Sequence, residues 1–482
     1  MTVTRFAPSP TGYMHIGNLR TALYSYLVAK HDGGRFILRI EDTDRERLVE
    51  GATDIIKDTL RITGLTYDEG PDVGGEHGPY VQSERKEIYM EYAKRLIDLG
   101  AAYYCFCSKE RLEKLHEEDA VGGYDRHCRD LSPEQVKKNL AAGMPFVIRQ
   151  KAPLSGVTTY TDAVFGEISM NNEELQDQIL IKADGYPTYN FCHVIDDYLM
   201  GVTHVVRGSE YLTSTPKYVL LYDAYGWERP TYVHLPLMMG RNEDGTVSKL
   251  SKRHGAVSFA DLLKDGYLPE AILNYIALLG WCPKETTTEF FTLDELKSAF
   301  TIDGVSKSPA VFDYDKLLWF NGEYIHALPD ERFRALADEF MKEPLPESCN
   351  RDKVLSLLKT RINKLSELDE RAAFFRALPA YDKELFLNKK NKITELSTVL
   401  TVLNAARPIL HSLESFDNDT LFASLSPLTE TLGMKVGAIM WCLRIAVSGL
   451  AATPGGATEI MEVIGKEEAL SRIDRAIALC SQ

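Results

Sequence analysis

The first forty residues alternate between strand and helix patterns, and this order constrains the fold more than any other feature of the chain. Residues 3–7 have a strand pattern that ends in a proline-rich loop. Apolar residues then recur at helical spacing over 16–27, and Gly33-Gly34 ends that helix before a second strand pattern at 36–40. A strand, a crossover helix and a second strand predict a parallel sheet, whose ligands bind at the carboxyl ends of the strands.

The remainder of the 482-residue chain is long enough for several domains. From about 72 to 185 the pattern changes to short β-like runs and isolated helices, which we interpret as an insertion between two halves of the sheet. The second half resumes near Tyr186 and includes a strand at 204–207. Beyond about 261, apolar residues recur overwhelmingly at helical spacing. Helices are predicted at 84–99, 216–225, 353–365, 393–406 and 435–446, and a break at 453–456 is predicted to separate the last two helices of the chain.

The chain carries a net charge of −15, which argues against a general nucleic-acid coat protein but not against local basic surfaces that contact an RNA. No apolar run approaches the roughly 20 residues that a membrane-spanning helix requires. The first residues lack a basic segment followed by an apolar one, so they do not match a secretory signal. We therefore expect a cytoplasmic protein with no membrane partner.

The segment Arg5–Asn18 combines a rigid loop with the start of a helix. Its prolines stiffen the loop, while Gly12 and Gly17 let a ligand approach the backbone closely. Unpaired N–H groups at a helix start favour a phosphate. His15 and Asn18 can then donate hydrogen bonds to an oxygen that gains charge during phosphoryl displacement. Taken alone, the segment is better explained as a helix start with a solvated histidine.

A second segment, Val247–Gly255, places several cations in one loop. Displacement of pyrophosphate from ATP builds negative charge, which a positioned ammonium stabilises in the transition state. Lys252 is the first candidate for that role and Lys249 is the second. An exposed basic loop without catalytic function is the better interpretation of this segment alone.

Together, the two segments resemble the two signatures of the class I aminoacyl-tRNA synthetases, which are named HIGH and KMSKS. Here they read His15-Ile16-Gly17-Asn18 and Lys249-Leu250-Ser251-Lys252-Arg253. The departures are Asn18, Leu250 and Arg253, and the glutamyl branch of the family is known for such variants. Further segments resemble bacterial glutamyl-tRNA synthetases: 5–12, 39–44, 68–71, 82–85, 184–189, 196–197, 201–208 and 435–437 with Arg444.

The resemblance implies an α/β Rossmann-type nucleotide-binding catalytic domain with an α+β insertion, followed by an all-α C-terminal anticodon-binding region. Residues 1–71 and 186–240 would form the two halves of the catalytic domain, 72–185 the connective insertion that binds the tRNA acceptor end, 241–322 a stem-contact region with the KLSKR loop, and 323–482 the anticodon-binding domain. The implied reaction is ligation of L-glutamate to tRNA(Glu) through glutamyl-adenylate, with ATP and Mg²⁺. Whether tRNA(Gln) is a second partner stays open, and the family suggests a monomer.

Glutamate carries two carboxylates, which planar guanidinium groups bind best. Arg5 and Arg207 lie at predicted strand ends and are the candidates for these carboxylates, while Glu41 suits the α-ammonium group. The resemblance implies glutamate binding by Arg5, Ala7, Ser9, Glu41, Tyr189 and Arg207, and ATP binding by Ser9, Gly12, His15, Gly17, Asn18 and Lys252. The role of His193, one helical turn beyond Tyr189, stays open.

Three of the eight cysteines, Cys105, Cys107 and Cys128, fall in one region with Asp130 nearby. The resemblance implies a structural zinc ion here, since some family members hold one with three cysteines and a histidine. Asp130 stands at the fourth place, and zinc accepts thiolate, imidazole or carboxylate ligands. Three free cysteines without a metal are an equal alternative.

Basic residues cluster in the helical tail beside aromatic residues, which suits a single-stranded loop such as an anticodon. One cluster is Arg351, Lys353, Lys359, Arg361 and Lys364, and the other is Lys389, Lys390 and Lys392, beside Phe374, Phe375 and Phe386. Solvated helix faces explain part of this pattern. The alternative functions are a glutaminyl-tRNA synthetase, whose anticodon region is built from β-barrels, and a catalytically inactive tRNA-binding paralogue.

Overall fold

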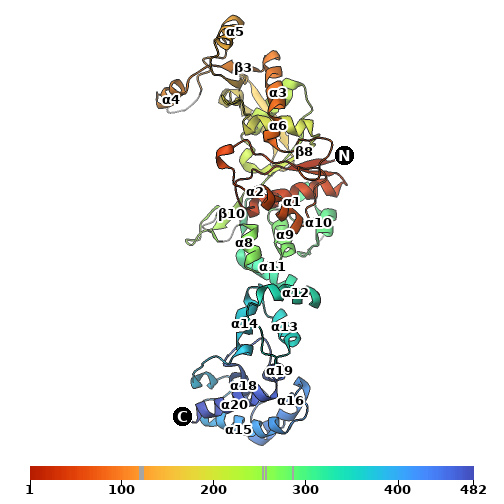
Figure 1. The fold of residues 1–482 in the computed structure, drawn as a ribbon, viewed down its shortest axis with the longest axis vertical. Helices are drawn as coiled ribbons and strands as arrows, with labels where there is room; N and C mark the ends of the chain where they lie inside the picture. The colour runs from red at the N-terminus through yellow and green to blue at the C-terminus, as the bar shows by residue number, and fades with distance from the viewer. Residues whose placement is uncertain (119–123, 252–253, 256–257, 285–286) are drawn as a thin grey trace. The chain divides into compact units, whose positions relative to one another are not determined.

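A computed structural model describes residues 1–118, 124–251, 254–255, 258–284 and 287–482 of the chain (Figure 1). The chain forms two compact units. Unit 1 comprises residues 1–263 and 269–314, and unit 2 comprises residues 264–268 and 315–482. In the described part of the chain, no helix combines the length and the apolarity needed to cross a membrane.

Unit 1 is built on parallel strands, as the sequence pattern predicts. Its main strands are β1 (Val3–Phe6), β2 (Arg35–Leu38), β5 (Val157–Asp162), β6 (Gly166–Asn171), β8 (His204–Gly208) and β9 (Thr231–Leu235). β1 pairs in parallel with β2, and β8 pairs in parallel with β9. The N–H of Thr203, just before β8, donates to the carbonyl of Val3 at 2.9 Å, which places the start of β8 beside the start of β1. The carboxyl ends of β1, β2 and β8 therefore meet at one edge.

Two strands from residues 72–185 belong to this same sheet. β5 pairs in parallel with β9 through Asp162 and Tyr232, and β6 pairs antiparallel with β5. Residues of β5 alternate between exposed and buried, because only one face of this strand lies against the core. A separate sheet holds β3 (Ala102–Cys105), β4 (Val147–Gln150) and β7 (Ile179–Ile181). The structure thus differs from the prediction that residues 72–185 stand apart from the nucleotide-binding sheet.

Helices of unit 1 flank these sheets (Figure 1). They are α1 (Ile16–His31), α2 (Ala52–Ile62), α3 (Lys86–Asp98), α4 (Lys109–Glu118), α5 (Pro133–Ala141), α6 (Tyr189–Leu199), α7 (Thr215–Tyr225), α8 (Phe259–Lys264), α9 (Pro269–Leu278) and α10 (Leu293–Ala299). α1 is buried on most of its sides, because it packs against β1, α9 and α10. The predicted helix at 84–99 begins with a short 3₁₀ turn at Gln82–Arg85 and continues as α3.

The second signature segment is carried by a three-stranded sheet of β10 (Met238–Arg241), β11 (Val247–Lys249) and β12 (Ala310–Phe312). β10 and β11 form an antiparallel hairpin, and β12 pairs in parallel with β10. β12 is an exception to the prediction of helices beyond 261. Pro309 immediately precedes it, and a proline cannot continue a helix from the residues before it.

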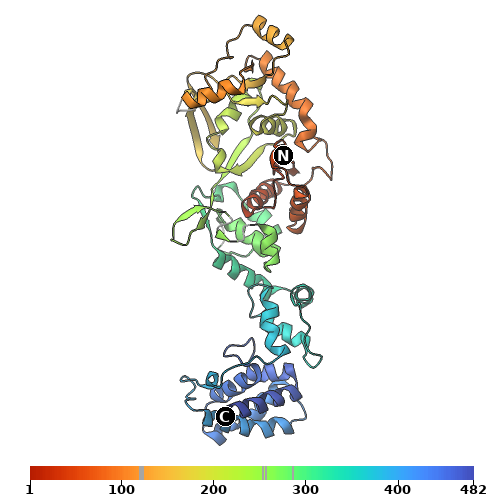
Figure 2. The same ribbon diagram turned by 60° about the vertical axis from the view of Figure 1, so that its left-hand side comes forward.

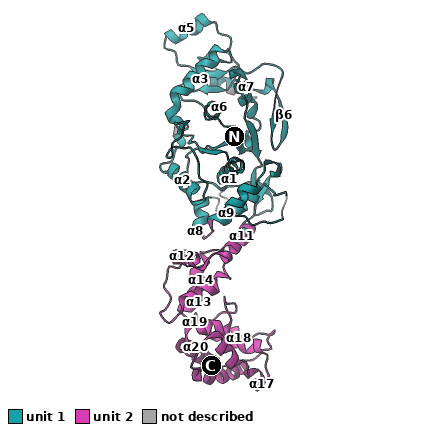
Figure 3. Ribbon diagram, turned by 90° about the vertical axis from the view of Figure 1, so that its right-hand side faces the viewer, with its two compact units in different colours: residues 1–263, 269–314 teal, residues 264–268, 315–482 magenta. Residues whose placement is uncertain are grey.

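Unit 2 is helical in the part that the structure describes, as predicted, and Figure 2 shows its last helices packed together. The helices that begin between 314 and 396 are α11 (Tyr314–Ala327), α12 (Asp330–Phe340), α13 (Arg351–Lys359), α14 (Glu367–Arg376) and α15 (Leu396–Ser412). The later ones are α16 (Asn418–Leu425), α17 (Leu428–Leu432), α18 (Val436–Ser448), α19 (Ala457–Ile464) and α20 (Lys466–Cys480). Unit 2 is drawn in magenta in Figure 3.

Two boundaries in unit 2 differ from the prediction. α13 ends at Lys359 and not at 365, because the N–H groups of Asn363 and Lys364 donate to the carboxylate of Glu367 at 3.1 and 3.0 Å and start the next helix. The break at 453–456 separates α18 from α19, whereas the last two helices meet at Gly465. Gly465 has φ 83°, a left-handed conformation that a residue without Cβ adopts at little cost.

Candidate active site

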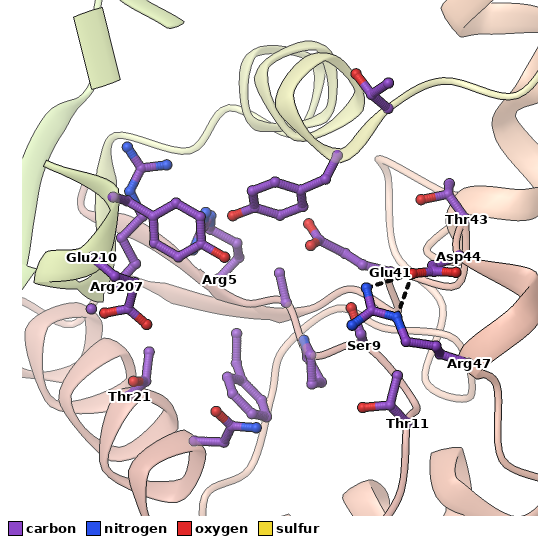
Figure 4. Close-up of a pocket in the computed structure, with 18 of the residues that line it drawn as sticks. Arg5, Ser9, Thr11, Thr21, Glu41, Thr43, Asp44, Arg47, Arg207 and Glu210 are labelled. Atoms are coloured by element: carbon purple, nitrogen blue, oxygen red, sulfur yellow. Dashed lines mark hydrogen bonds and ion pairs between the residues drawn. The ribbon is translucent and has the colours of Figure 1, made fainter. Parts of the chain in front are cut away.

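A cavity of about 640 Å³ opens in unit 1, where the strand ends meet. Its wall contains all six residues that the sequence predicts for glutamate: Arg5, Ala7, Ser9, Glu41, Tyr189 and Arg207. In Figure 4, Arg5 and Arg207 lie on one side of the cavity and Asp44 and Arg47 on the other, with Glu41 between them. The fold thus brings residues from distant segments of the chain around one space.

Local structure explains how these side chains reach the cavity. Arg5 lies near the end of β1 and Arg207 near the end of β8. Glu41 follows β2, and its N–H donates to the carbonyl of Pro8 at 3.0 Å. Tyr189 is the first residue of α6. Since the three strands are parallel neighbours, their ends deliver two guanidinium groups and a carboxylate to the same edge.

A buried network of three guanidinium groups and three carboxylates adjoins the cavity. Its members are Arg5, Arg39, Arg85, Glu41, Asp196 and Asp197. Arg39 is central, because its Nη1 donates to Asp197 Oδ1 at 2.7 Å and its Nη2 to Glu41 Oε1 at 3.0 Å. Burial raises the pKa of Asp197, but the charges of Arg5 and Arg39 outweigh burial and hold that pKa below its usual range. At Glu41 the balance is reversed. Burial raises the pKa of this carboxyl more than the charges of Arg39 and Arg5 lower it.

Arg5 and Arg207 differ in their partners. The Nε of Arg5 donates to Asp197 Oδ1 at 3.0 Å, so this arginine already has a carboxylate. Arg207 is equally buried, with 4% of its surface exposed, but within the described residues no carboxylate forms an ion pair with it. Three tyrosine rings face its guanidinium group, with centroids at 5.0, 4.9 and 5.6 Å: Tyr211, Tyr218 and Tyr232. A buried guanidinium group with neutral neighbours is a strong site for an anion.

The first signature places His15 at the start of α1, where it is the N-cap residue. Its Nδ1 accepts a hydrogen bond from the N–H of Gly17 at 3.0 Å. A Cβ added at Gly17 would lie 3.3 Å from that nitrogen, so the close approach favours glycine there. Burial, and secondarily the charge of Lys249, lower the pKa of His15. The imidazole is therefore neutral near pH 7 and carries its proton on Nε2, from which it can donate to a ligand.

The second signature lies beside the first within unit 1. The N–H of Phe259 donates to the carbonyl of Met14 at 3.0 Å, and His15 forms a β-bridge with Ser258. On the other side of the loop, the N–H of Leu250 donates to the carbonyl of Met238 at 2.9 Å. Lys249 acts electrostatically on His15, whereas Lys252 lies outside the described residues. Of the predicted signature residues, Asn18 belongs to the cavity wall, and Gly12, His15, Gly17 and Lys249 do not.

Two known protein families match this chain, one after the other along the sequence. Residues 1–319 match the family described as "tRNA synthetases class I (E and Q), catalytic domain", and residues 332–477 match an "Anticodon binding domain". The chain belongs to the class I tRNA synthetases. The resemblance of its two signatures to this family, and the predicted α/β catalytic domain followed by a helical anticodon-binding region, are confirmed.

Individual synthetases match over nearly the whole chain. The glutamate–tRNA ligase of Clostridium tetani is 54% identical over 474 residues, which cover 98% of this chain and 96% of that protein. The glutamate–tRNA ligase of Clostridium kluyveri is 54% identical over 478 residues, with 98% and 97% covered. A crystal structure of a glutamate tRNA ligase from Elizabethkingia meningosepticum in complex with its amino acid has a TM-score of 0.89 at 37% identity, and covers 99% of both chains. This chain is therefore similar to these glutamate–tRNA ligases over nearly its whole length.

Several residues of the cavity wall were not predicted as site residues: Thr11, Thr21, Thr43, Asp44, Arg47, Lys182, Glu210 and Tyr211. Thr43 and Asp44 lie within 39–44, a segment that resembles bacterial glutamyl-tRNA synthetases, so the signal for them was present. Arg47 lies three residues beyond Asp44, and its Nε donates to Asp44 Oδ2 at 2.6 Å. Thr11 likewise lies within the resembling segment 5–12, whereas nothing in the sequence placed Thr21, Lys182, Glu210 and Tyr211 at the site.

The three predicted cysteines form one cluster of the synthetase, since the sulfur atoms of Cys105, Cys107 and Cys128 all lie within 4.8 Å of one another. Burial raises the pKa of Cys105, but hydrogen bonds from Tyr124, from the Cys107 N–H and from Arg149 outweigh burial and bring that pKa below its usual value. Burial and the neighbouring Cys105 raise the pKa of Cys107 to about 12.

Asp130, the predicted fourth ligand, is not part of this cluster. Its side chain is 86% exposed, and it lies 3.6 Å from Nζ of Lys151. Water and an ammonium partner stabilise this carboxylate outside the cluster. The hydroxyl of Tyr124 instead faces the thiols, at 3.2 Å from Cys105 Sγ and 3.8 Å from Cys107 Sγ.

Most basic residues of the first predicted cluster in unit 2 form ion pairs with carboxylates. Four of the five in the first cluster form ion pairs: Arg351 with Asp338, Lys353 with Glu462, Lys359 with Asp330, and Lys364 with Asp265. The three aromatic residues named beside these clusters, Phe374, Phe375 and Phe386, are all buried in the folded chain. Arg361 has no ion pair within the described residues, and with Phe374 it lines a cavity of about 620 Å³ in unit 2.

Proposed function

We propose that this synthetase ligates L-glutamate to tRNA(Glu) at the expense of ATP, through a glutamyl-adenylate intermediate. The observation that carries the proposal is Arg207, a buried cation whose hydrogen-bond partners among the described residues are all neutral, in a cavity whose wall also holds Arg5 and Glu41. Glutamate, with two carboxylates and one ammonium group, complements two guanidinium groups and one carboxylate. Arg207 takes the side-chain carboxylate, Glu41 the α-ammonium group, and Arg5, Ala7, Ser9 and Tyr189 complete the site.

The α-carboxylate of the bound glutamate attacks the α-phosphorus of ATP in line, and pyrophosphate leaves. No covalent enzyme intermediate is needed, so the residues position the reactants and stabilise charge. His15 donates from Nε2 and Asn18 from its amide to the phosphate oxygens, while Lys249 and Lys252 stabilise the leaving pyrophosphate. Gly12 and Gly17 allow ATP to approach the backbone. A Mg²⁺ ion would neutralise part of the triphosphate charge when ATP binds.

The transfer step requires tRNA, whose terminal ribose hydroxyl attacks the adenylate. We assign the acceptor end to residues 72–185 and the anticodon to unit 2. The unit 2 cavity supports the second assignment through Arg361, which has no ion pair within the described residues and lines the cavity beside Pro454, whereas Arg376 in the same wall is paired with Asp369 at 2.6 Å. Cations and apolar surfaces around a cavity suit an unstacked nucleotide. The protein acts as a monomer in this scheme.

Charging assays separate this function from its rivals. The purified protein is expected to attach radioactive glutamate, and not glutamine, to tRNA(Glu) in the presence of ATP. Attachment of glutamine would indicate a glutaminyl-tRNA synthetase, and tRNA binding without ATP–pyrophosphate exchange would indicate an inactive paralogue. The same assay with tRNA(Gln) tests whether the enzyme also charges that tRNA.

Replacing Arg207 by alanine is expected to raise the KM for glutamate about 100-fold, which corresponds to the loss of a buried charge-assisted contact. The KM for ATP should change by less than about threefold, since no ATP contact is assigned to Arg207. Because the partners of Arg207 are neutral, its removal leaves no buried charge unpaired, and the thermal unfolding midpoint should change little. Equal increases in the KM for glutamate and for ATP would show that Arg207 does not bind glutamate.

We also propose that Cys105, Cys107 and Cys128 hold a structural zinc ion, with the Tyr124 hydroxyl as the fourth group. Three thiols within 4.8 Å of one another fit the ligand set, and four protein groups leave no open position for catalysis. Purified protein is expected to contain about one zinc ion per chain by elemental analysis. Cys107→Ser should lower that content severalfold, while Asp130→Ala and Cys282→Ser should not. A zinc content near zero in the unmodified protein would refute the site.

A further inference from the structure

The partners of Arg207 are arranged so that part of its guanidinium group stays free. Its Nε donates to Nε2 of His234 at 3.1 Å, its Nη2 to Oγ1 of Thr215 at 2.7 Å, and its Nη1 approaches Nε2 of His193 at 3.4 Å. A guanidinium group has five N–H donors, and the described residues supply acceptors for three of them. Each nitrogen has one protein acceptor, so the two remaining donors are one on Nη1 and one on Nη2, the pair that binds a carboxylate with two parallel hydrogen bonds.

Contacts on the other side of all three acceptors orient them so that a lone pair faces Arg207. The Nδ1 of His234 lies 2.6 Å from Asp162 Oδ2, so it carries the proton and leaves Nε2 free to accept. In the same way, the Nδ1 of His193 donates to the carbonyl of Tyr189 at 2.7 Å. The hydroxyl of Thr215 donates to the carbonyl of Tyr211 at 2.7 Å and so offers only its lone pairs to Arg207.

Asp162 is the nearest acid in this chain of contacts, and it is kept away from Arg207 by the His234 ring. Its Oδ1 accepts from the N–H groups of Val164 and Phe165 at 2.9 and 2.8 Å, and its Oδ2 accepts from the N–H of His234 at 3.1 Å. These bonds hold the carboxylate behind the histidine. Arg207 is thus oriented by neutral acceptors, unlike Arg5, which contacts Asp197 directly.

We infer that Thr215, His193 and His234 are positioning residues that make the site selective for a carboxylate over the corresponding amide. They orient the guanidinium group without neutralising it, so a bound carboxylate supplies its only direct counter-ion. A neutral amide would leave that buried guanidinium group without a direct carboxylate partner, with Asp197 acting on it only at longer range. Asp162 contributes by fixing the tautomer of His234. The inference rests on the proposed binding of glutamate by Arg207.

Variants at Thr215 test this directly, because the residue contacts Arg207 from the first turn of α7, where an acidic side chain is favourable for the helix. Thr215→Ser keeps the acceptor and should leave the KM for glutamate within about twofold of the unmodified enzyme. Thr215→Val removes the acceptor without adding charge and should raise that KM about tenfold. Thr215→Asp gives Arg207 a direct carboxylate and should raise it about 100-fold. The KM for ATP should stay within about threefold in all three variants.

The decisive readout is the ratio of kcat/KM for glutamine to that for glutamate in the charging assay. Thr215→Asp should raise this ratio at least about tenfold, whereas Thr215→Val should not, since only the aspartate neutralises Arg207. Tyr225→Phe is the matched control, because its hydroxyl lies on the same helix α7 but donates to the carbonyl of Tyr92 at 2.7 Å and not to a partner of Arg207. It should change neither quantity.

An unchanged ratio in Thr215→Asp, or equal effects of valine and aspartate, would overturn the inference. If Thr215→Asp shows no cooperative thermal unfolding, the comparison of valine with serine decides, and equal KM values for glutamate in those two variants would refute positioning by Thr215. Failure of the unmodified protein to charge tRNA with glutamate would instead refute the proposed function. The two failures are therefore distinguishable.

Discussion

Replacing Lys252 by alanine is expected to lower the rate of ATP–pyrophosphate exchange about 1,000-fold, the cost of removing one preorganised group that stabilises transition-state charge. The charge on the leaving pyrophosphate grows during the reaction, so the ammonium group acts more strongly on the transition state than on bound ATP. The KM for ATP should therefore change much less than kcat. Exchange is measured with glutamate, ATP and tRNA all present, so that it is detected whether or not activation requires tRNA.

The structure supports this expectation through the residues that flank Lys252. The N–H of Leu250 donates to the carbonyl of Met238, whose sulfur would lie 3.9 Å from a Cβ added at Gly17. Ser258 pairs with His15, so the described residues on either side of Lys252 lie near the first signature. The charge of Lys249, another cation of this loop, contributes to lowering the pKa of His15 in the first signature. Lys249→Ala, the second candidate, should reduce exchange less than Lys252→Ala.

Lys284→Ala is a suitable control for the loss of a lysine from unit 1. Its Nζ lies 3.5 Å from Asp303 Oδ2, and its side chain is 60% exposed, so it belongs to the solvated surface. Exchange should be unchanged in that variant, and both proteins should unfold at the same temperature as the unmodified one. Near-normal exchange by folded Lys252→Ala would exclude the assigned role.

The positions of Arg5, Glu41 and Arg207 could be predicted because strand order decides where strand ends lie. Once a βαβ unit is recognised, the residues at the carboxyl ends of its strands must face the same edge. Their partners could not be predicted in the same way. Asp162 reaches His234 only because β5 pairs with β9, and nothing in the local sequence of β5 shows which strand it joins.

The wrong predictions have a different cause, which is that spacing and charge do not specify partners. Asp130 follows Cys128 at the spacing of a ligand, but its carboxylate is solvated and lies beside Lys151. The hydroxyl of Tyr124, which the structure places 3.2 Å from Cys105 Sγ, was not among the predicted site residues. Lys353 counts as a basic residue in the sequence, yet in the fold its charge is matched by Glu462. Only the fold shows which charged side chains have an ion-pair partner.

Replacing Asp196 by alanine is expected to destabilise unit 1 by about 3–5 kcal/mol, the cost of breaking a buried ion pair from one side. Asp196 is fully buried and holds Arg85 Nε at 2.7 Å and Gln82 Nε2 at 2.8 Å. The side chain of Arg85 is only 2% exposed, so it cannot recover water when the carboxylate is removed. Much of the variant should therefore be unfolded or aggregated on expression.

Asp58→Ala removes a carboxylate from a comparable ion pair that differs in its exposure. Asp58 lies 2.9 Å from Arg61, and the two side chains are 60% and 74% exposed, so the expected loss is below about 1 kcal/mol. Asp196→Asn should fall between the two, because an amide keeps the shape and one acceptor but loses the charge. Urea denaturation of unit 1, followed by tryptophan fluorescence, measures all three. If Asp196→Ala and Asp58→Ala unfold at the same urea concentration, the buried network does not stabilise the fold, and its role must be confined to the orientation of Arg5 and Glu41.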